Sequence, residues 1–334
     1  MARLPALSQD PAEAARVLAS GGLVAFPTET VYGLGADAES GAAVARVFRV
    51  KGRPTDHPLI VHGADAGVLE RYGRDVPAIA RALADALWPG PLTVLVRSSG
   101  RVDPATVGGR ETVGLRVPDH PLALRMLRDV GRGVAAPSAN RFGRTSPTTA
   151  AHVAADLGAD VDLVLDGGAC RVGVESTIVD LSGPAPVLLR AGGVPLERLA
   201  DLLGTDVTRG EGGPARAPGM LESHYAPRAR VELADGAAAT ARAAALAASG
   251  TRVGILGHVE VPPGVAALTP APGADGYARD LYRLLRRADD DGLEVVVAVP
   301  PSPAGLGLAV TDRLRRAASS SPPPGGGARA TGAP

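Results

Sequence analysis

Two cations flank a glycine at Lys51-Gly52-Arg53, and the rigid Pro54 follows them. A lysine ammonium acts as a point charge and an arginine guanidinium as a planar fork, so the pair could bind a polyphosphate. A solvated basic turn is the usual interpretation of such a triplet. Lys51 is the one lysine in the chain, however, and Asn140 is the one asparagine. We infer that both residues are used for their own chemistry, with chance as the competing explanation.

Polar turns follow two short apolar strands, which we expect at Leu23–Phe26 and Val134–Ala136. The first turn, residues 27–35, holds two threonine hydroxyls, a carboxylate and two glycines, and the second, Pro137–Asn140, offers hydroxyl and amide groups. Ligands in open α/β sheets bind at the carboxyl ends of strands, so both turns are candidate ligand contacts, with an ordinary loop as the alternative. His62 ends another apolar strand, and it is either a core histidine or a ligand contact.

Arg116 is a charged residue in the middle of the apolar strand that we expect at Val113–Val117. It needs an anionic partner, because an unpaired buried charge is strongly destabilising. That partner could be Glu29, Glu175 or the carboxylate of a substrate, and the guanidinium fork suits a carboxylate.

Ser146-Pro147 has the cap-then-proline pattern of a helix start, and we expect a helix from there to about Leu157. Ser146 would be a pure N-cap, an anion contact at the helix N-terminus, or both. The chain contains no G-x-x-x-x-G-K-[ST] loop, no G-x-G-x-x-G and no H-E-x-x-H. Phosphates must then be held by scattered Lys, Arg, Ser and N–H donors, so catalysis would rest on positioning and charge neutralisation.

Strands and helices alternate over the first two hundred residues, which predicts an α/β fold with some antiparallel neighbours. A Gly-, Pro- and Arg-rich stretch, Thr208–Pro218, interrupts this pattern and suggests an extended loop. We therefore expect a catalytic domain at 1–205, a linker at 206–230, a small Rossmann-like domain at 231–317 and a disordered tail at 318–334.

Aromatic residues make up only 3% of the chain, so the core must be built from alanine, valine and leucine. Acidic and basic residues number 35 each, and this balance provides no global field toward nucleic acid or membrane. Cys170, the single cysteine, excludes an intramolecular disulfide and a cysteine-rich zinc site. We see neither a signal peptide nor a membrane span, so we expect a cytoplasmic protein.

Several strings of the chain resemble the threonylcarbamoyl-AMP synthases, the YrdC-like family. The resemblance covers nearly all of residues 8–204 and rests on FPTETVYGLG (26–35), KGRPTDHPL (51–59), WPGPLT (88–93), GLRVP (114–118), PSAN (137–140) and GVESTIVD (173–180). Segments 217–220, 224–227 and 305–313 resemble the linker and the C-terminal domain of the longer, two-domain form.

The resemblance implies a fold and a reaction. The fold is a twisted mixed sheet with helices around a concave basic cavity, plus a smaller Rossmann-like α/β domain, with the linker over the opening. In the reaction, L-threonine, bicarbonate and ATP give L-threonylcarbamoyladenylate and pyrophosphate. Mg²⁺ is expected alongside ATP, without a protein metal site. Downstream tRNA threonylcarbamoyl-transfer proteins use that product to modify the adenosine next to the anticodon. A weak RNA contact is an open expectation, and no membrane partner is implied.

The resemblance also divides the site residues between two substrates. Those expected to hold threonine, with Arg116 clamping its carboxylate, are Thr30, His62, Arg116 and Ser176. ATP is expected to be held by Lys51, Arg53, His57, Thr112, Ser138, Asn140, Ser146, Arg190 and Tyr225. Among these, Lys51 and Arg53 are the expected catalytic cations, which contact the phosphates. Three features depart from the family pattern: His57 stands where asparagine is expected, Ala191 follows Arg190 where proline is common, and Leu221 and Glu222 replace an expected basic residue.

Two other functions remain open at this point. A noncatalytic RNA-binding module would suit a basic concave fold, but the neutral net charge and the absence of interleaved basic and aromatic patches count against it. A carbamoyl-transfer enzyme with another acceptor is the second alternative. Such relatives carry this domain inside a larger chain with zinc-finger cysteines, and this chain has one cysteine.

Overall fold

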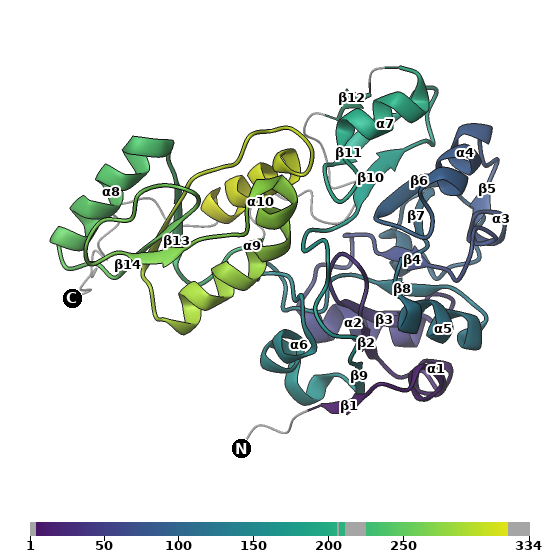
Figure 1. Ribbon diagram of the computed structural model, residues 1–334. Coiled ribbons are helices and arrows are strands. Elements are labelled where there is room, and N and C mark those ends of the chain that lie inside the picture. Colours follow the sequence, from purple (N-terminus) through teal and green to yellow (C-terminus); the bar gives the residue numbers. More distant parts are fainter. Residues whose placement is uncertain (1–4, 206, 211–224, 320–334) are drawn as a thin grey trace, which may run out of the picture.

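The computed structural model describes residues 5–205, 207–210 and 225–319, which form a larger and a smaller α/β part (Figure 1). The predicted α/β class, with a mixed sheet and a second, smaller unit, is confirmed. Leu221 and Glu222 of the predicted linker, and the tail from residue 320 on, lie outside the described residues. No helix within the described ranges is long and apolar enough to cross a membrane.

Among the described residues, the larger part contains a 12-stranded mixed sheet in the order β1-β9-β2-β3-β8-β4-β7-β6-β10-β11-β12, with β5 paired to β6. Its strands are β1 (Ala6–Ser8), β2 (Val24–Phe26), β3 (Gly33–Asp37), β4 (Ile60–His62), β5 (Gly73–Arg74), β6 (Leu92–Ser98), β7 (Thr112–Arg116), β8 (Val134–Ala136), β9 (Leu163–Leu165), β10 (Thr177–Asp180), β11 (Val187–Arg190) and β12 (Thr208–Arg209). At its centre β4 and β7 run parallel, which places His62 directly beside Arg116.

Helices cover this sheet, and the side chains of Asp10, Ser40 and Thr149 cap three of those described. They are α1 (Pro11–Ala19), α2 (Gly41–Lys51), α3 (Val68–Tyr72), α4 (Ala78–Leu87), α5 (Pro121–Val130), α6 (Ala150–Leu157) and α7 (Leu196–Leu203), with short 3₁₀ turns at Pro104–Val107 and Gly158–Asp160. The Asp10 side chain caps α1 by accepting from the Ala12 N–H, as the sequence predicts. Gly52 ends α2 in the left-handed conformation, at φ 64°, and so turns the chain sharply between Lys51 and Arg53.

Two local predictions were wrong. Residues 33–37 are not part of a loop, because they form β3, which pairs antiparallel with β2. No helix starts at Ser146, since α6 begins at Ala150 and Thr149 caps it. The physical reason is that the Pro147 and Thr148 carbonyls accept from the N–H groups of Tyr32 and Cys170, which holds this segment extended.

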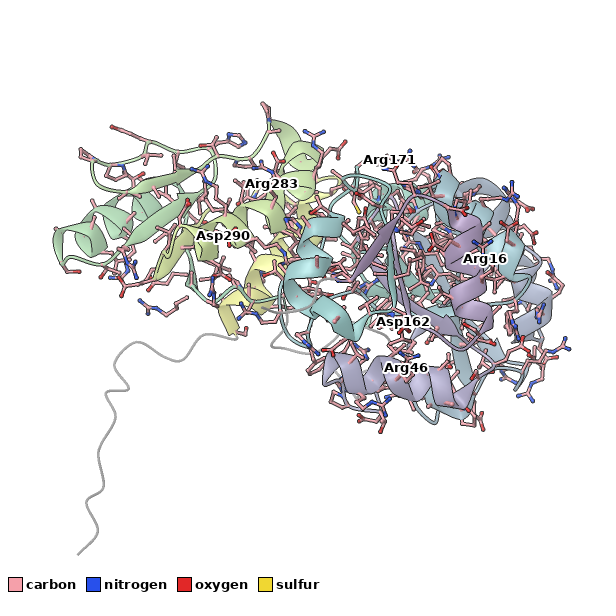
Figure 2. The ribbon with its side chains drawn as sticks, turned by 90° about the horizontal axis from the view of Figure 1, so that it is seen from below. Arg16, Arg46, Asp162, Arg171, Arg283 and Asp290 are labelled. Carbon is pink, nitrogen blue, oxygen red and sulfur yellow. The ribbon has the colours of Figure 1, made fainter. Side chains whose placement is uncertain are left out.

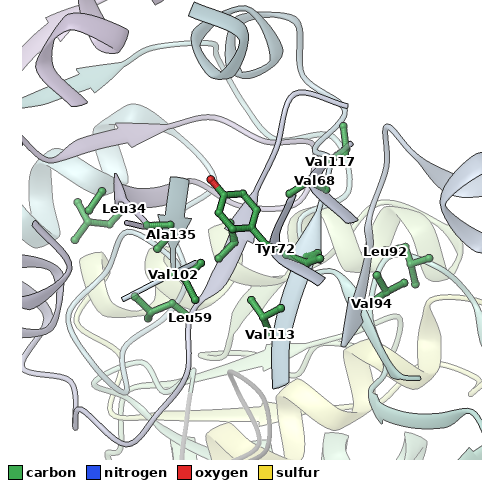
Figure 3. Close-up of a cluster of buried hydrophobic side chains, with 14 of the residues drawn as sticks. Leu34, Leu59, Val68, Tyr72, Leu92, Val94, Val102, Val113, Val117 and Ala135 are labelled. Atoms are coloured by element: carbon green, nitrogen blue, oxygen red, sulfur yellow. The ribbon is translucent and has the colours of Figure 1, made fainter. Parts of the chain in front are cut away.

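The core of the larger part is aliphatic, as the low aromatic content requires. Leu34, Leu59, Val94 and Val113 pack together with Tyr72, one of its few buried aromatic rings (Figure 3). Charged side chains lie mainly on the outside of the molecule, where Arg46 and Asp162 form an ion pair of 2.8 Å (Figure 2).

The smaller part is a four-stranded parallel sheet in the order β13-β16-β14-β15. Its elements are β13 (Arg230–Leu233), α8 (Gly236–Ala248), β14 (Val253–Leu256), β15 (Ala266–Leu268), α9 (Gly273–Asp290), β16 (Val295–Ala298) and α10 (Gly307–Ser319). Val174 of the larger part belongs to the same apolar cluster as Tyr282 of α9 and Leu314 of α10. The two parts therefore share buried surface next to the polar segment that contains Glu175.

Candidate active site

A cavity is lined by residues of the central strands β4, β7 and β8 and of the polar turns that follow β2 and β8. Its lining residues are Thr28, Thr30, Val31, Gly33, Arg53, Ile60, His62, Arg116, Ala136, Pro137, Ser138, Glu175, Ser176, Arg190 and Tyr225. Most of the predicted site residues are therefore brought together here. Those that do not line the cavity are Lys51, His57, Thr112, Asn140 and Ser146.

The turn after β2 is built around the Thr28 hydroxyl. Its oxygen accepts from the N–H groups of Thr30 and Val31 at 3.1 and 3.2 Å, which fixes the turn tightly. The neighbouring turn is joined to it, because the Ala139 N–H donates to the Tyr32 carbonyl and the Leu34 N–H to the Pro137 carbonyl. The two sequence motifs thus form one wall of the cavity.

Arg116 finds its anionic partner in Glu29. Its Nη2 lies 2.8 Å from Glu29 Oε2, donates to Thr30 Oγ1 at 2.9 Å, and both charged side chains are almost fully buried. Glu29 Oε2 also accepts from the Asp119 N–H at 3.0 Å. Glu29 was one of the three partners that the sequence allowed, and a buried guanidinium held in this way presents a fixed cation to the cavity.

His62 lies beside Arg116 and is neutral. Burial, and then the charge of Arg116, lowers the pKa of the His62 imidazole to about 3. Its ring also meets Phe26 edge to face, with centroids 5.6 Å apart. His62 is therefore both a core residue and a cavity residue, and it adds no charge to the site at neutral pH.

Ser176 is held between a strand and a buried arginine. Its hydroxyl lies 2.8 Å from Thr93 Oγ1, and Arg190 donates to its carbonyl and to its Oγ at 3.0 Å each. Arg190 is itself buried and lines the cavity. These contacts fix a second cation close to the segment that starts β10.

Arg53 adds a third cavity cation, directly after the α2 C-terminus. Its Nη2 donates to the Pro58 carbonyl at 3.0 Å and its Nε to the His57 carbonyl at 3.3 Å. Burial lowers the pKa of Arg53 to about 10, so the group stays charged at neutral pH. His57 lies near the Phe142 ring at the side of this turn, and Thr112 begins β7 at a half-buried position.

Lys51 points away from the lined cavity and into the adjacent turn. Its Nζ donates to the carbonyls of Ser138 and Asn140 at 2.5 Å each, and the side chain is buried. Asn140 completes this brace, because its Nδ2 donates to the carbonyls of Arg141 and Arg144. The one lysine and the one asparagine of the chain thus stabilise the same turn, and their predicted ATP contacts stay predictions.

Glu175 is a cavity residue whose role the sequence did not identify. The Ser146 hydroxyl donates to Glu175 Oε1 at 2.7 Å and does not cap a helix. The other partners of Glu175 are Tyr282 and Arg313 of the smaller part. These residues lie more than a hundred positions away along the chain, so no local pattern could have revealed the pairing.

Tyr225 lines the cavity. It is buried and has a left-handed backbone, at φ 66°, which is unusual for a residue other than glycine. The next residue, Ala226, donates its N–H to the Gly143 carbonyl at 3.0 Å, and this contact ties residues 225–226 to the larger part.

The cavity is basic and offers no protein metal site. Three arginines line it against the single carboxylate of Glu175. Within the described part of the chain, no three His, Cys, Asp or Glu side chains are grouped so as to hold a metal ion. The arrangement suits an anionic substrate, and the buried arginines could stabilise charge that develops on a leaving phosphate.

Comparisons with known proteins agree over both parts. A family model described as "Telomere recombination" matches residues 16–192, and one described as "Threonylcarbamoyl-AMP synthase, C-terminal domain" matches residues 194–319. The chain is 42% identical to the threonylcarbamoyl-AMP synthase of Pyrococcus abyssi over 315 residues, covering 91% of this chain and 92% of that one. It is 39% identical to that of Bacillus subtilis, covering 92% of each.

A solved structure is similar over nearly the whole chain. The crystal structure of P. abyssi Sua5 complexed with L-threonine matches with a TM-score of 0.90 and 38% sequence identity, covering 96% of this chain and 98% of that chain. That structure holds L-threonine on a protein of the same fold.

Proposed function

The chain belongs to the threonylcarbamoyl-AMP synthase family, and from this premise we propose that its cavity holds L-threonine and ATP next to each other. The enzyme synthesises L-threonylcarbamoyladenylate from L-threonine, bicarbonate and ATP with release of pyrophosphate, for the threonylcarbamoyl modification of tRNA. Family membership over both parts favours this function over an RNA-binding module or another carbamoyl-transfer enzyme.

Threonine would bind at the end of the cavity formed by Thr30, His62, Arg116 and Ser176. The observation that carries this assignment is the buried Arg116 guanidinium, fixed by Glu29 and facing into the cavity. A guanidinium binds a carboxylate through paired hydrogen bonds, so it would fix the amino acid in one orientation. A neutral His62 beside it would accept or donate a hydrogen bond without repelling the substrate ammonium or amine.

ATP would bind next to it, with its phosphates near Arg53 and Arg190. The support is their position: both are buried, both line the cavity, and Ser138 lies on the same wall. We keep Lys51, Asn140, Ser146, His57 and Thr112 as proposed nucleotide residues. Lys51 and Asn140 would act through the turn that they brace, since they do not line the cavity.

The chemistry needs positioning and charge stabilisation rather than a covalent intermediate on the protein. Threonine and bicarbonate give the N-carboxylate with loss of water. An oxygen of this carbamate then attacks the α-phosphorus of ATP, and the bond from phosphorus to the pyrophosphate oxygen breaks. Arg53 and Arg190 would stabilise the negative charge that accumulates on pyrophosphate as it leaves.

Mg²⁺ would enter with ATP and be held by its phosphates. The described residues do not fit a metal site, because the one cavity carboxylate, Glu175, already accepts from Ser146, Tyr282 and Arg313. We further propose that threonylcarbamoyl-transfer proteins use the product, with any direct RNA contact being weak. The boundaries at 205 and 231 are also proposals. The larger sheet extends beyond 205 to Arg209 through β12, and the smaller sheet begins at Arg230.

One assay tests the proposed function. The protein is incubated with ATP, bicarbonate and one amino acid at a time, and pyrophosphate release is measured. We expect release that requires both threonine and bicarbonate. Pyrophosphate formation that is independent of threonine, or equal with serine and valine, would contradict the assignment.

A further inference from the structure

The carboxylate of Glu175 joins the two parts of the chain at the cavity wall. On one side, Oε1 accepts from Ser146 Oγ at 2.7 Å. On the other side, Tyr282 of α9 lies 2.9 Å from each carboxylate oxygen, and Arg313 Nε of α10 donates to Oε2 at 2.7 Å. Two of its three partners therefore come from the smaller part.

Arg313 is built into this position. It is the largest fully buried side chain among the described residues, with 1% exposure. Its Nη1 donates to Asp312 at 2.7 Å, and Asp312 also accepts from Arg316. The guanidinium lies over the ring of Tyr225, 5.1 Å from its centroid, and so contacts a second residue of the cavity lining.

The Glu175 carboxylate places a negative charge beside the proposed ATP phosphates. The carboxylate lines the same cavity as Arg53 and Arg190, which would bind the ATP phosphates. Burial alone would raise the pKa of Glu175, but Arg313, followed by Arg190 and the Ser146 hydrogen bond, lowers it to about 2. The group is thus a buried anion facing a polyphosphate site, and without compensation it would repel the ligand and attract Arg190.

We propose that Arg313 and Tyr282 complete the ATP end of the site from the smaller part, by holding and neutralising Glu175 so that Arg190 is oriented toward the nucleotide. This inference rests on the proposed function and gives the C-terminal part a role in the reaction. Arg313 acts through Glu175 and is a positioning residue, because it does not itself line the cavity.

The competing explanation is that the Arg313–Glu175 pair merely fastens the two parts together. The chain provides a comparison, since Arg286 of α9 forms a two-pronged ion pair with Asp156 of α6 at 3.0 and 2.6 Å and also donates to the Thr145 carbonyl at 2.5 Å. That pair also joins the two parts, but neither residue lines the cavity. A purely mechanical role predicts similar effects when either arginine is replaced.

The experiment compares Arg313→Met, Arg286→Met, Glu175→Gln and the double variant Glu175→Gln/Arg313→Met in the full chain. ATP binding is measured by calorimetry without threonine, and KM and kcat are measured by threonine-dependent pyrophosphate release. Thermal unfolding reports whether each variant is folded. Tyr282→Phe removes two hydrogen bonds without a charge and is expected to have a smaller effect than Arg313→Met.

We expect Arg313→Met to weaken ATP binding by about tenfold or more, because a buried anion is left unpaired. KM for threonine should change by less than about threefold, and Arg286→Met should bind ATP like the wild type. The decisive result is rescue: the double variant, which lacks both charges, should bind ATP more tightly than Arg313→Met alone.

Additive effects in the double variant, or an equal loss in Arg286→Met, would overturn the proposal. If Arg313→Met does not fold, Arg313→Lys decides the same question, because it keeps a cation but lacks the fork. Its weaker ATP binding should then be relieved by Glu175→Gln, and the absence of relief would count against the proposal. Since ATP binding is measured without threonine, a failure of the proposed reaction is recognised separately, by wild-type protein that binds ATP but releases no pyrophosphate.

Discussion

Arg116 Nη2 lies 2.8 Å from Glu29 Oε2, and this buried pair sets the orientation of the cation in the proposed threonine site. The Arg116 Nε also donates to the Gly90 carbonyl at 3.3 Å, so two edges of the guanidinium are held by protein atoms. The pairing explains how an arginine is tolerated at the end of a central strand. It also means that stability and substrate binding depend on the same side chain.

Replacing Arg116 by lysine should separate the two roles. The charge remains near Glu29, but the planar fork is lost, so KM for threonine should rise by about tenfold or more while KM for ATP changes little. Arg116→Ala should in addition lower the free energy of unfolding by about 3–5 kcal/mol, because Glu29 is left buried and unpaired. Pyrophosphate release at varied threonine and urea unfolding provide the two measurements.

Arg125 offers a control for this experiment. It forms an i,i+4 ion pair with Asp129 on the solvent side of α5, where its side chain is 64% exposed. Arg125→Ala should change the free energy of unfolding by about 0.5 kcal/mol or less and leave both KM values unchanged. An Arg116→Lys effect confined to ATP would refute the threonine assignment.

Lys51→Met should reduce activity through the turn that Lys51 braces. The methionine keeps the length of the side chain but leaves the Ser138 and Asn140 carbonyls without their donor. A displaced turn would misplace Ser138, and a misplacement of this kind costs about 100-fold in rate. The variant should still unfold cooperatively. Arg49→Met, on the exposed face of the same helix, should retain wild-type turnover, and near-normal activity of Lys51→Met would show that its single occurrence is accidental.

The strand-end rule predicts only part of the cavity. Thr30 and Ser138 follow β2 and β8, which run in the same direction, so their turns meet at one edge of the sheet. Arg116 ends β7, which runs the opposite way, and its long side chain reaches Thr30 from there. The direction of a side chain is harder to predict, as Lys51 shows. The sequence around Lys51 predicts a phosphate contact. Its Nζ instead donates to two backbone carbonyls of a turn almost ninety residues later.

The contribution of the smaller part could not be predicted from local patterns. Arg313 contacts Glu175 across 138 positions of the chain. The helix pattern indicates the buried charge but not its partner, because Ala309, Val310, Leu314 and Ala317 lie on one face of α10, and Arg313 occupies that same face. An arginine on the apolar side of a helix needs a buried anion, by the same argument that applied to Arg116 in its strand.

Acidification should destabilise the protein partly through His62. Its pKa is about 3 in the folded state and near 6.5 when unfolded, so below pH 6.5 the unfolded chain binds the additional proton. The contribution of His62 to the free energy of unfolding is therefore fully present above pH 6.5. It falls as the pH decreases toward 3, by at most about 1.4 kcal/mol per pH unit. Urea unfolding at pH 7 and pH 5 measures the loss.

His62→Gln isolates this contribution, because the amide does not titrate. We expect the variant to lose less stability than the wild type between pH 7 and pH 5, even if it is less stable at pH 7. The remaining dependence would come from other histidines with lowered pKa values, among them His152, whose pKa burial lowers to about 4. Equal losses in both proteins would show that His62 is not held neutral in the folded state.

Gly192 tests how closely the segment of Glu175 is packed. A Cβ added at Gly192 would lie 2.3 Å from the Glu175 carbonyl oxygen and 2.4 Å from the Ser176 carbonyl carbon, and neither backbone atom can move alone. Gly192→Ala should therefore push the segment toward the cavity, disturb the Ser176 contacts with Thr93 and Arg190, and lower the free energy of unfolding by about 1–3 kcal/mol. Gly183→Ala is the matched control, since a Cβ there meets nothing within 4 Å. Activity should fall in the first variant and persist in the second, and equal activity in both would mean that the segment can shift without disturbing the cavity.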